Sequence, residues 1–110
     1  MANTFKLKTK ANVGVTTVGI YTAPAATTTV VIGITLSNTS GSGVNVGVAV
    51  SRTSDTKDDV SLLKNAPIPQ GSSLEFMGGN KVVLETNDQI TVDSDTNNSV
   101  DASLTIMEIT

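Results

Sequence analysis

Apolar and polar residues alternate with a period of two along most of this chain. The alternation is longest in segments 27–38, 44–51 and 100–109. Successive side chains of a β-strand point to opposite faces of a sheet, so this pattern predicts strands that bury one face and expose the other. No window of ten residues or more carries the 3.6-residue spacing of an amphipathic helix. The pattern therefore predicts an all-β fold.

The three longest runs define the expected core. One face of each run carries the apolar side chains: Val30, Ile32, Ile34 and Leu36; then Val44, Val46, Val48 and Val50; then Val100, Ala102, Leu104 and Ile106. Small residues at 38–43 separate the first two runs, and this spacing predicts a hairpin between them. In the last strand Met107 and Ile109 add apolar groups on the opposite face, so this strand requires cover on both sides.

Segment 66–93 predicts three further short strands joined by two turns. Residues 78–80 (Gly-Gly-Asn) accept positive φ at little cost, as a tight hairpin requires. Residues 86–88 (Thr-Asn-Asp) predict the second turn. The outer faces of the longer strands carry small residues at Gly33 and Gly47, which indicates a close backbone approach, a kink, or packing against another subunit.

The spacing of these runs predicts about eight to ten short strands, joined by turns every 8–12 residues or so. We therefore expect a single domain over residues 1–110, folded as a β-sandwich of immunoglobulin-like or jelly-roll-like type. A change of parity near residues 16–17 predicts a bulge or a bend. Segment 52–59 is polar and charged, and we expect it to be an exposed loop.

Composition narrows the classes of function. Hydrophobic residues make up 38% of the chain and aromatic residues only 3%, so we expect an aliphatic core, which often accompanies burial against other subunits. The net charge of −3 disfavours a nucleic-acid partner. We see no secretory leader and no apolar run near the ~20 residues of a membrane span, so we expect a soluble protein made in the cytoplasm.

Residues suited to chemistry are sparse. The chain has no His and no Cys, which removes the commonest general base, the commonest metal ligand and any disulfide. Segment 93–98 matches the D-x-D-x-N opening of a calcium loop, but Asn98 replaces its glycine and Leu104 its final glutamate, so we expect an ordinary turn. The carboxylates of segment 55–59 are expected to be solvated. We therefore expect no catalysis, no cofactor and no metal.

Four stretches carry a resemblance to a known family. They are 3–14 (NTFKLKTKANVG), 20–41 (IYTAPAATTTVVIGITLSNTSG), 67–90 (PIPQGSSLEFMGGNKVVLETNDQI) and 99–109 (SVDASLTIMEI). They resemble the small virion structural proteins of tailed bacteriophages, especially those of marine cyanophages. The resemblance covers nearly the whole chain, and its motifs are turns and strand ends. It implies an all-β subunit of the particle and brings no catalytic residues with it.

The resemblance implies a structural component of the virion that acts through protein–protein contacts. A capsid decoration (cement) protein is the favoured role, because a compact domain without a fibrous region suits repeated surface sites. A neck, tail or baseplate subunit is the alternative, and a host-glycan-binding module that uses Tyr21 as its aromatic platform is a further one. In the virion roles the protein is made in the host cytoplasm and contacts other virion proteins and copies of itself.

The two chain ends are the predicted contact surface. Segment 5–10 alternates apolar residues with lysines, and the last strand ends apolar on both faces. The expected subunit interface comprises Phe5, Lys6, Leu7, Lys8, Lys10, Met107 and Ile109. We expect the lysines to form an outer row on an edge strand, where they discourage aggregation or dock on an acidic neighbour. Between subunits, they could pair with the late carboxylates Asp93, Asp95, Asp101 and Glu108.

Overall fold

The computed structural model describes residues 2–52, 58–76 and 81–110. Within these ranges the chain forms nine strands: β1 (Asn3–Val13), β2 (Val18–Thr22), β3 (Thr28–Asn38), β4 (Val44–Ser51), β5 (Val60–Ile68), β6 (Ser73–Phe76), β7 (Val82–Leu84), β8 (Gln89–Ser94) and β9 (Val100–Ile109). The same residues contain no helix long and apolar enough to cross a membrane. The bend expected near residues 16–17 separates β1 from β2.

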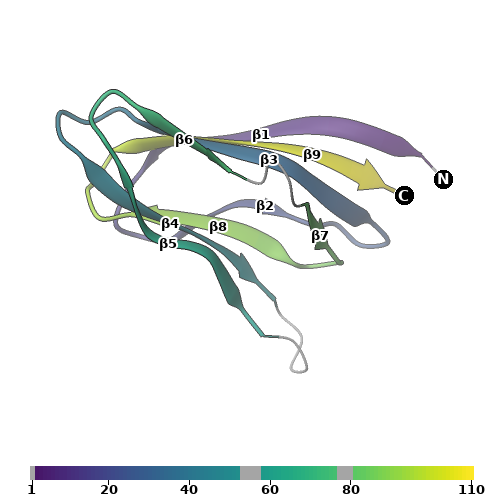
Figure 1. Cartoon of the computed structure of the whole chain (residues 1–110). Helices are drawn as coiled ribbons and strands as arrows, with labels where there is room; N and C mark the ends of the chain where they lie inside the picture. Colours follow the sequence, from purple (N-terminus) through teal and green to yellow (C-terminus); the bar gives the residue numbers. More distant parts are fainter. Residues whose placement is uncertain (1, 53–57, 77–80) are drawn as a thin grey trace.

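The strands form two antiparallel sheets that face each other (Figure 1). One sheet has the order β1-β9-β3, and both β6 and β7 pair with the remaining side of β3; the other has the order β2-β8-β4-β5. The expected all-β sandwich is therefore confirmed. The two chain ends lie at the same corner (Figure 1), where Ala2 and Thr110 exchange two backbone hydrogen bonds of 3.0 Å.

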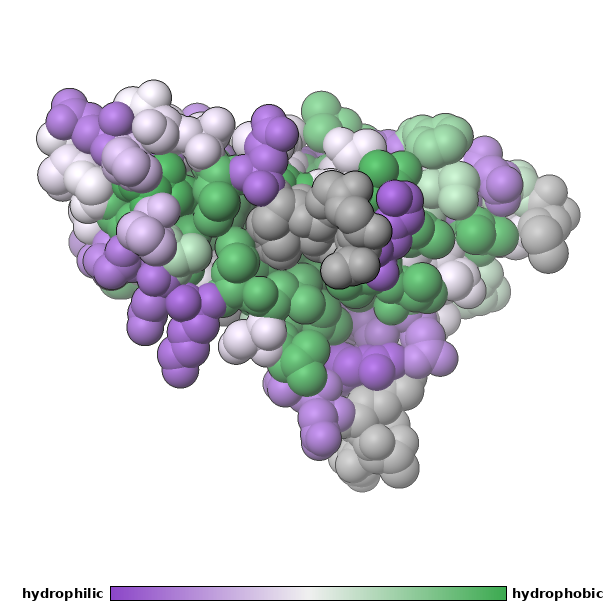
Figure 2. All heavy atoms as spheres, viewed as in Figure 1, coloured by the Kyte–Doolittle hydropathy of each residue, from purple (hydrophilic) through white to green (hydrophobic). Residues whose placement is uncertain are grey.

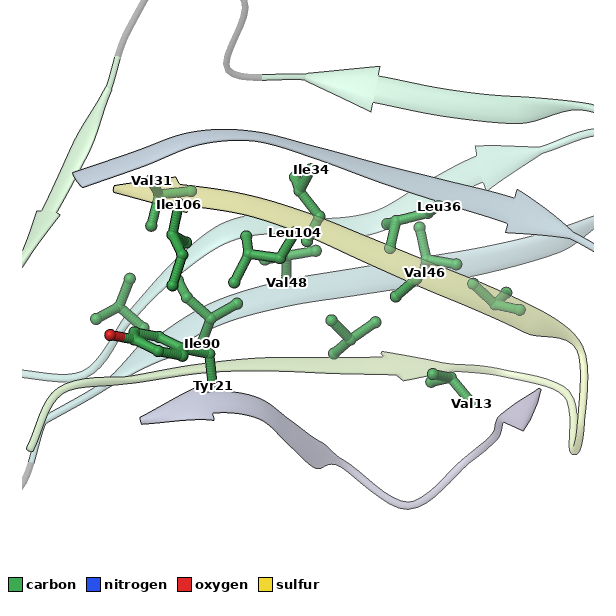
Figure 3. Packing of buried hydrophobic residues seen from close by; sticks show 14 of the residues in the cluster. Val13, Tyr21, Val31, Ile34, Leu36, Val46, Val48, Ile90, Leu104 and Ile106 are labelled. Carbon is green, nitrogen blue, oxygen red and sulfur yellow. The ribbon is translucent and has the colours of Figure 1, made fainter. Parts of the chain in front are cut away.

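The core between the sheets is built from aliphatic side chains of both (Figure 3). The four valines of β4 and the even-numbered residues 100–106 of β9 are buried, as their alternation predicted. Figure 2 shows hydrophobic side chains reaching the surface along the edge where β5 lies across from β6 and β7. Leu62, Leu74 and Val82 are among the partly buried residues packed against the core.

The connection between β3 and β4 crosses from one sheet to the other, so the hairpin expected there is wrong. Each strand presents one apolar face, and the sandwich buries these faces across the core instead of placing the strands side by side. Buried Asn38 holds the crossing. Its Nδ2 donates to the carbonyl oxygens of Ser42 and Ile68 at 2.8 and 2.9 Å, and its Oδ1 accepts from the Ser40 amide at 2.9 Å.

The strands β6 and β7 follow one another along β3. β6 pairs with residues 34–37 of β3, and β7 pairs with residues 29–31. The expectation that these strands form a hairpin with each other is therefore wrong, and residues 78–80, where the turn was placed, lie outside the described part of the chain. The turn expected next is present, since the Asp88 amide donates to the Glu85 carbonyl at 3.0 Å.

A β-bulge interrupts the regular pairing of β3 with β9. Val31 pairs with Ile106 and Gly33 with Thr105, so Ile32 is an extra residue with no partner position on β9. Such an insertion shifts the alternation by one residue, so odd-numbered residues face the core before it and even-numbered residues face the core after it.

The bulge corrects the expected core of β3. Ile34 and Leu36 are buried as predicted, but Val31 is buried in place of Val30 and Ile32. Val30 and Ile32 are half-buried on the far side of the sheet. The expected assignment of these two residues is wrong because the alternation does not continue through the inserted position.

We expect Val48→Ala to lower the free energy of unfolding by roughly 1.5–3 kcal/mol, because the lost methyl groups are fully buried and leave a cavity. Val48 is 1% exposed, whereas Val60, on the neighbouring strand β5, is 50% exposed. Val60→Ala is therefore the matched control and should change stability by no more than about 0.5 kcal/mol. Urea unfolding followed by circular dichroism measures both, and equal losses would contradict the assigned core.

Candidate interaction surface

The sheet built on β1, β9 and β3 has one face toward the core and one face away from it, which we call the outer face. Directly paired residues of an antiparallel sheet point to the same side. The even-numbered residues of β9 point into the core, so its odd-numbered residues and their partners make up the outer face.

Four apolar side chains form a continuous row across the outer face. Phe5 pairs with Met107. Met107 also pairs with Val30, which in turn pairs with Val83. Phe5 is 69% exposed and Val83 is 56% exposed, while the two between them are half-buried. Paired side chains lie about 5 Å apart, so these four residues make one connected surface, the apolar row.

Further apolar side chains lie beside the apolar row. Leu7, two residues along β1 from Phe5, is 64% exposed, and Ile109 is half-buried at the end of β9. Figure 2 shows hydrophobic side chains on this upper side of the molecule near the chain ends. Contiguous exposed apolar surface of this kind is typical of an interaction site.

Beyond the apolar row the outer face carries small side chains and contains two shallow depressions. The larger, of about 360 Å³, lies over Gly33 and is lined by Thr105 and Glu75 among others. The smaller, of about 270 Å³, lies between Thr9 and Asp101. A Cβ added to Gly33 would meet no atom within 4 Å, so the backbone there is open to close approach.

Charge is scarce on the outer face. Among the described strand residues that point outward here, Glu75 and Asp101 are the charged ones, and both lie on the half away from the apolar row. The centres of protein interfaces are depleted in charged residues and enriched in Phe and Met. The outer face therefore has the composition of a surface that another protein covers.

The structure divides the seven predicted interface residues between two faces. Four lie together on the outer face: Phe5, Leu7, Met107 and Ile109. The lysines Lys6, Lys8 and Lys10 pair with buried residues of β9 and therefore point to the inner side. The expectation of an outward row of lysines is wrong. β1 buries Val13 alone, so its own alternation between apolar residues and lysines does not reveal which side faces the core.

Sequence reasoning left three residues out of this surface: Val30, Ile32 and Val83. Nothing in the local pattern marks the bulge that turns Val30 and Ile32 outward. A signal existed for Val83, since it alternates with Val82 and Leu84, of which Leu84 is fully buried.

A polar network lies beneath the inner side of β1. The carboxylate of Glu108, 6% exposed, accepts from the Tyr21 hydroxyl at 2.6 Å and pairs with Lys6 Nζ at 2.7 Å. The Tyr21 hydroxyl also lies 2.7 Å from Thr29 Oγ1, and Lys8 Nζ lies 6.0 Å from the centre of the Tyr21 ring. The network therefore joins β1, β9 and β3 to β2 of the opposite sheet.

The network bears on two of the sequence-based expectations, one about Tyr21 and one about the lysines of β1. Tyr21 is 7% exposed and its hydroxyl is bound within the chain, so the alternative in which Tyr21 forms an exposed aromatic platform for a glycan is wrong. Of the lysines and late carboxylates expected to pair, Lys6 and Glu108 form an ion pair within the chain.

The network shifts two pKa values in opposite directions. The hydrogen bond from Lys6, followed by that from Tyr21, lowers the pKa of Glu108 below its ordinary value of 4.5. Burial, followed by the hydrogen bond to Glu108, raises the pKa of Tyr21 to about 12. At neutral pH the carboxylate is therefore ionised and the phenol is protonated, which is the state that the hydrogen bond requires.

We expect this network to make the protein less stable in acid. Because the pKa of Glu108 is lowered on folding, the stabilisation that the ionised carboxylate provides is complete above its ordinary, unfolded-state pKa of 4.5 and is lost as the pH falls through the lower folded-state value. The loss of unfolding free energy between neutral pH and about pH 3 should be smaller in Glu108→Gln and in Lys6→Ala than in the wild type. Lys10→Ala is the control on the same side of β1 and should retain the wild-type pH dependence. Unchanged pH dependence in Glu108→Gln would contradict this role.

Arg52 connects the end of β4 to the turn before β8. Its Nε lies 3.1 Å from both carboxylate oxygens of Asp88, which is 2% exposed, and its guanidinium also pairs with Glu85. Its backbone amide donates to Asp59 at 2.6 Å. Two of the carboxylates expected to be solvated, Asp58 and Asp59, are exposed. The third, at position 55, lies outside the described residues.

The carboxylates of the calcium-like segment bind separate partners. Asp93 accepts from the Thr17 hydroxyl at 3.2 Å, and Asp95 accepts from the Asn45 amide at 3.1 Å. The part of the chain that the structure describes contains no group of three or more side chains placed to hold a metal ion.

A Cβ on Gly47 would come within 2.6 Å of the Asp93 carboxylate, so that glycine makes room for a side chain of its own sheet.

No protein-family model matches this chain, and no curated protein matches it. Among solved structures, the chain is similar to a protein from a study with the heading "Bacillus endospore appendages form a novel family of disulfide-linked pili". The two chains are 14% identical and superpose with a TM-score of 0.53 over 99% of this chain and 87% of the other. At this identity the likeness establishes a shared β-sandwich fold and nothing about activity.

Proposed function

We propose that this chain is a structural subunit that acts through protein–protein contacts and performs no catalysis. The apolar row carries the proposal, because its two end members, Phe5 and Val83, are more than half exposed in the isolated chain. Burying an exposed side chain of this size stabilises a complex by up to roughly 1.5–3 kcal/mol. A partner that covers the row therefore gains affinity from several side chains at once.

The similar pilus protein supports the proposal at the level of architecture. It is described as belonging to disulfide-linked pili, so a domain with this fold serves elsewhere as part of an extended assembly. This chain has no Cys, so any assembly that it forms must be held without disulfides. The apolar row is suited to supply that noncovalent contact.

More specifically, we propose that the chain is a subunit of a tailed-phage virion, made in the host cytoplasm, and that it decorates the capsid. The resemblance of its turns and strand ends to virion structural proteins supports this role, as does the compact sandwich that the described residues form. A neck, tail or baseplate subunit is the second candidate. The free side of the 11-residue edge strand β1 favours that alternative, since it offers a lateral contact for a ring of subunits.

We expect an antibody against this protein to label purified phage particles at many sites on the capsid surface in electron micrographs. Label confined to the neck or tail would support the second candidate. Particles that lack the protein by mass spectrometry would contradict the virion role.

Incorporation into particles should depend on the apolar row. Val83→Lys places a charge at one end of the row and should reduce incorporation at least about 10-fold, because a partner that covers the row would bury that charge against apolar groups. Val15 is also 56% exposed but lies in the bend between β1 and β2, so Val15→Lys is the matched control and should be incorporated normally. Equal loss for both variants would contradict a specific role for the row.

A further inference from the structure

We infer that the protein that covers the outer face is a second copy of this chain, in a symmetric dimer whose two-fold axis runs parallel to the strands. The inference rests on the proposed function only in assigning a protein partner to this face; it adds the identity of the partner and its orientation. In this dimer the sheet containing β1, β9 and β3 stacks on the same sheet of the second copy. Stacked sheets commonly align their strands to within about 30°.

The outer face is large enough for a stable dimer. β1, β3 and β9 have 11, 11 and 10 residues, and β6 and β7 add four and three residues in the fourth position. At ~3.4 Å per residue and ~4.8 Å between strands, these strands cover roughly 640 Å². That is about 1,300 Å² for the two copies together, within the usual range of about 1,200–2,000 Å² for specific protein–protein interfaces.

A sheet face can stack on its own copy with the two-fold axis along the strands or across them. An axis along the strands reverses the order of the strands, so each cross-strand row faces the same row of the second copy. With an axis across the strands, each strand faces the same strand of the second copy but runs in the opposite direction. The apolar row then faces the far end of the second copy's outer face. The two arrangements therefore differ in what each outward side chain meets.

With the axis along the strands, apolar side chains meet apolar side chains. Phe5 then faces Val83 of the second copy, and Met107 faces Val30 of the second copy, as their shared register requires. One position further along, a Thr105 side chain approaches Gly33 of the second copy, where the missing Cβ and the depression of about 360 Å³ leave room.

The two carboxylates of the face distinguish the arrangements. With the axis along the strands, Asp101 faces the Ser37 hydroxyl of the second copy and Glu75 faces the Thr9 hydroxyl, so each acceptor meets a donor. With the axis across the strands, Asp101 would face Ile109, and Glu75 would face a valine of the apolar row. Burying an unpaired carboxylate against apolar groups is costly, so the axis along the strands is favoured.

Sedimentation equilibrium of the wild-type chain tests the dimer, with a dissociation constant expected at or below about 10 μM. Val83→Lys should weaken dimerisation at least about 10-fold, and Val15→Lys, at equal exposure away from the face, should leave it unchanged. Thermal unfolding of both variants establishes that they are folded. A wild-type chain that stays monomeric at about 100 μM, where such a dimer would predominate, or equal weakening by both variants, overturns the inference.

Cross-linking tests the orientation, because an introduced cysteine is unique in a chain that has none. Mixed Phe5→Cys and Val83→Cys copies should be joined by a short bis-maleimide, since facing sheets lie about 10 Å apart. Mixed Phe5→Cys and Thr9→Cys copies should not be joined, because these positions face each other only with the axis across the strands. Efficient linkage of the second mixture in place of the first overturns the proposed orientation.

The outcomes separate this inference from the proposed function. A monomeric chain whose incorporation into particles still depends on Val83 would overturn the dimer and leave the structural role in place. A dimer with the expected cross-links would support the inference even if the protein were absent from phage particles.

Discussion

Close packing of aliphatic side chains between the two sheets is the interaction on which the rest of the structure depends. The alternate residues of β9 and β4 meet across the core, and no disulfide and few aromatic rings are present to assist them. A core of this kind constrains side-chain parity strictly, because a shift by one residue moves a strand's whole apolar set to the other face. That constraint therefore also decides which side of each strand stays outside the core, including the side that carries the apolar row.

The core sides of β4 and β9 could be predicted from the sequence because their alternation is uninterrupted. That of β3 could be predicted only in part, since the extra residue Ile32 changes the parity without a local signal. Which strands lie side by side was also beyond prediction. A short polar connection after β3 suits a hairpin or a crossing equally, and the crossing is held by Asn38, whose side chain reaches Ile68 in β5.

The candidate surface was predictable where a strand is apolar on both faces, as at Met107 and Ile109. It was not predictable at the lysines of β1, because an edge strand with one buried residue has little core contact of its own to set its inner side. Pairing with β9 sets that side instead, and Lys6 then meets Glu108. The buried carboxylate of Glu108 in β9 thus finds its ion-pair partner in Lys6, near the start of the chain.

The two chain ends lie side by side, joined through Ala2 and Thr110 at the corner nearest the apolar row. A short peptide could therefore close this backbone into a ring, and new ends could be opened at a surface turn without rethreading either sheet. The same geometry fixes where a fused partner would emerge. A fluorescent protein or an antigen attached at either end would leave from one corner, so both choices of fusion would present their cargo beside the same sheet.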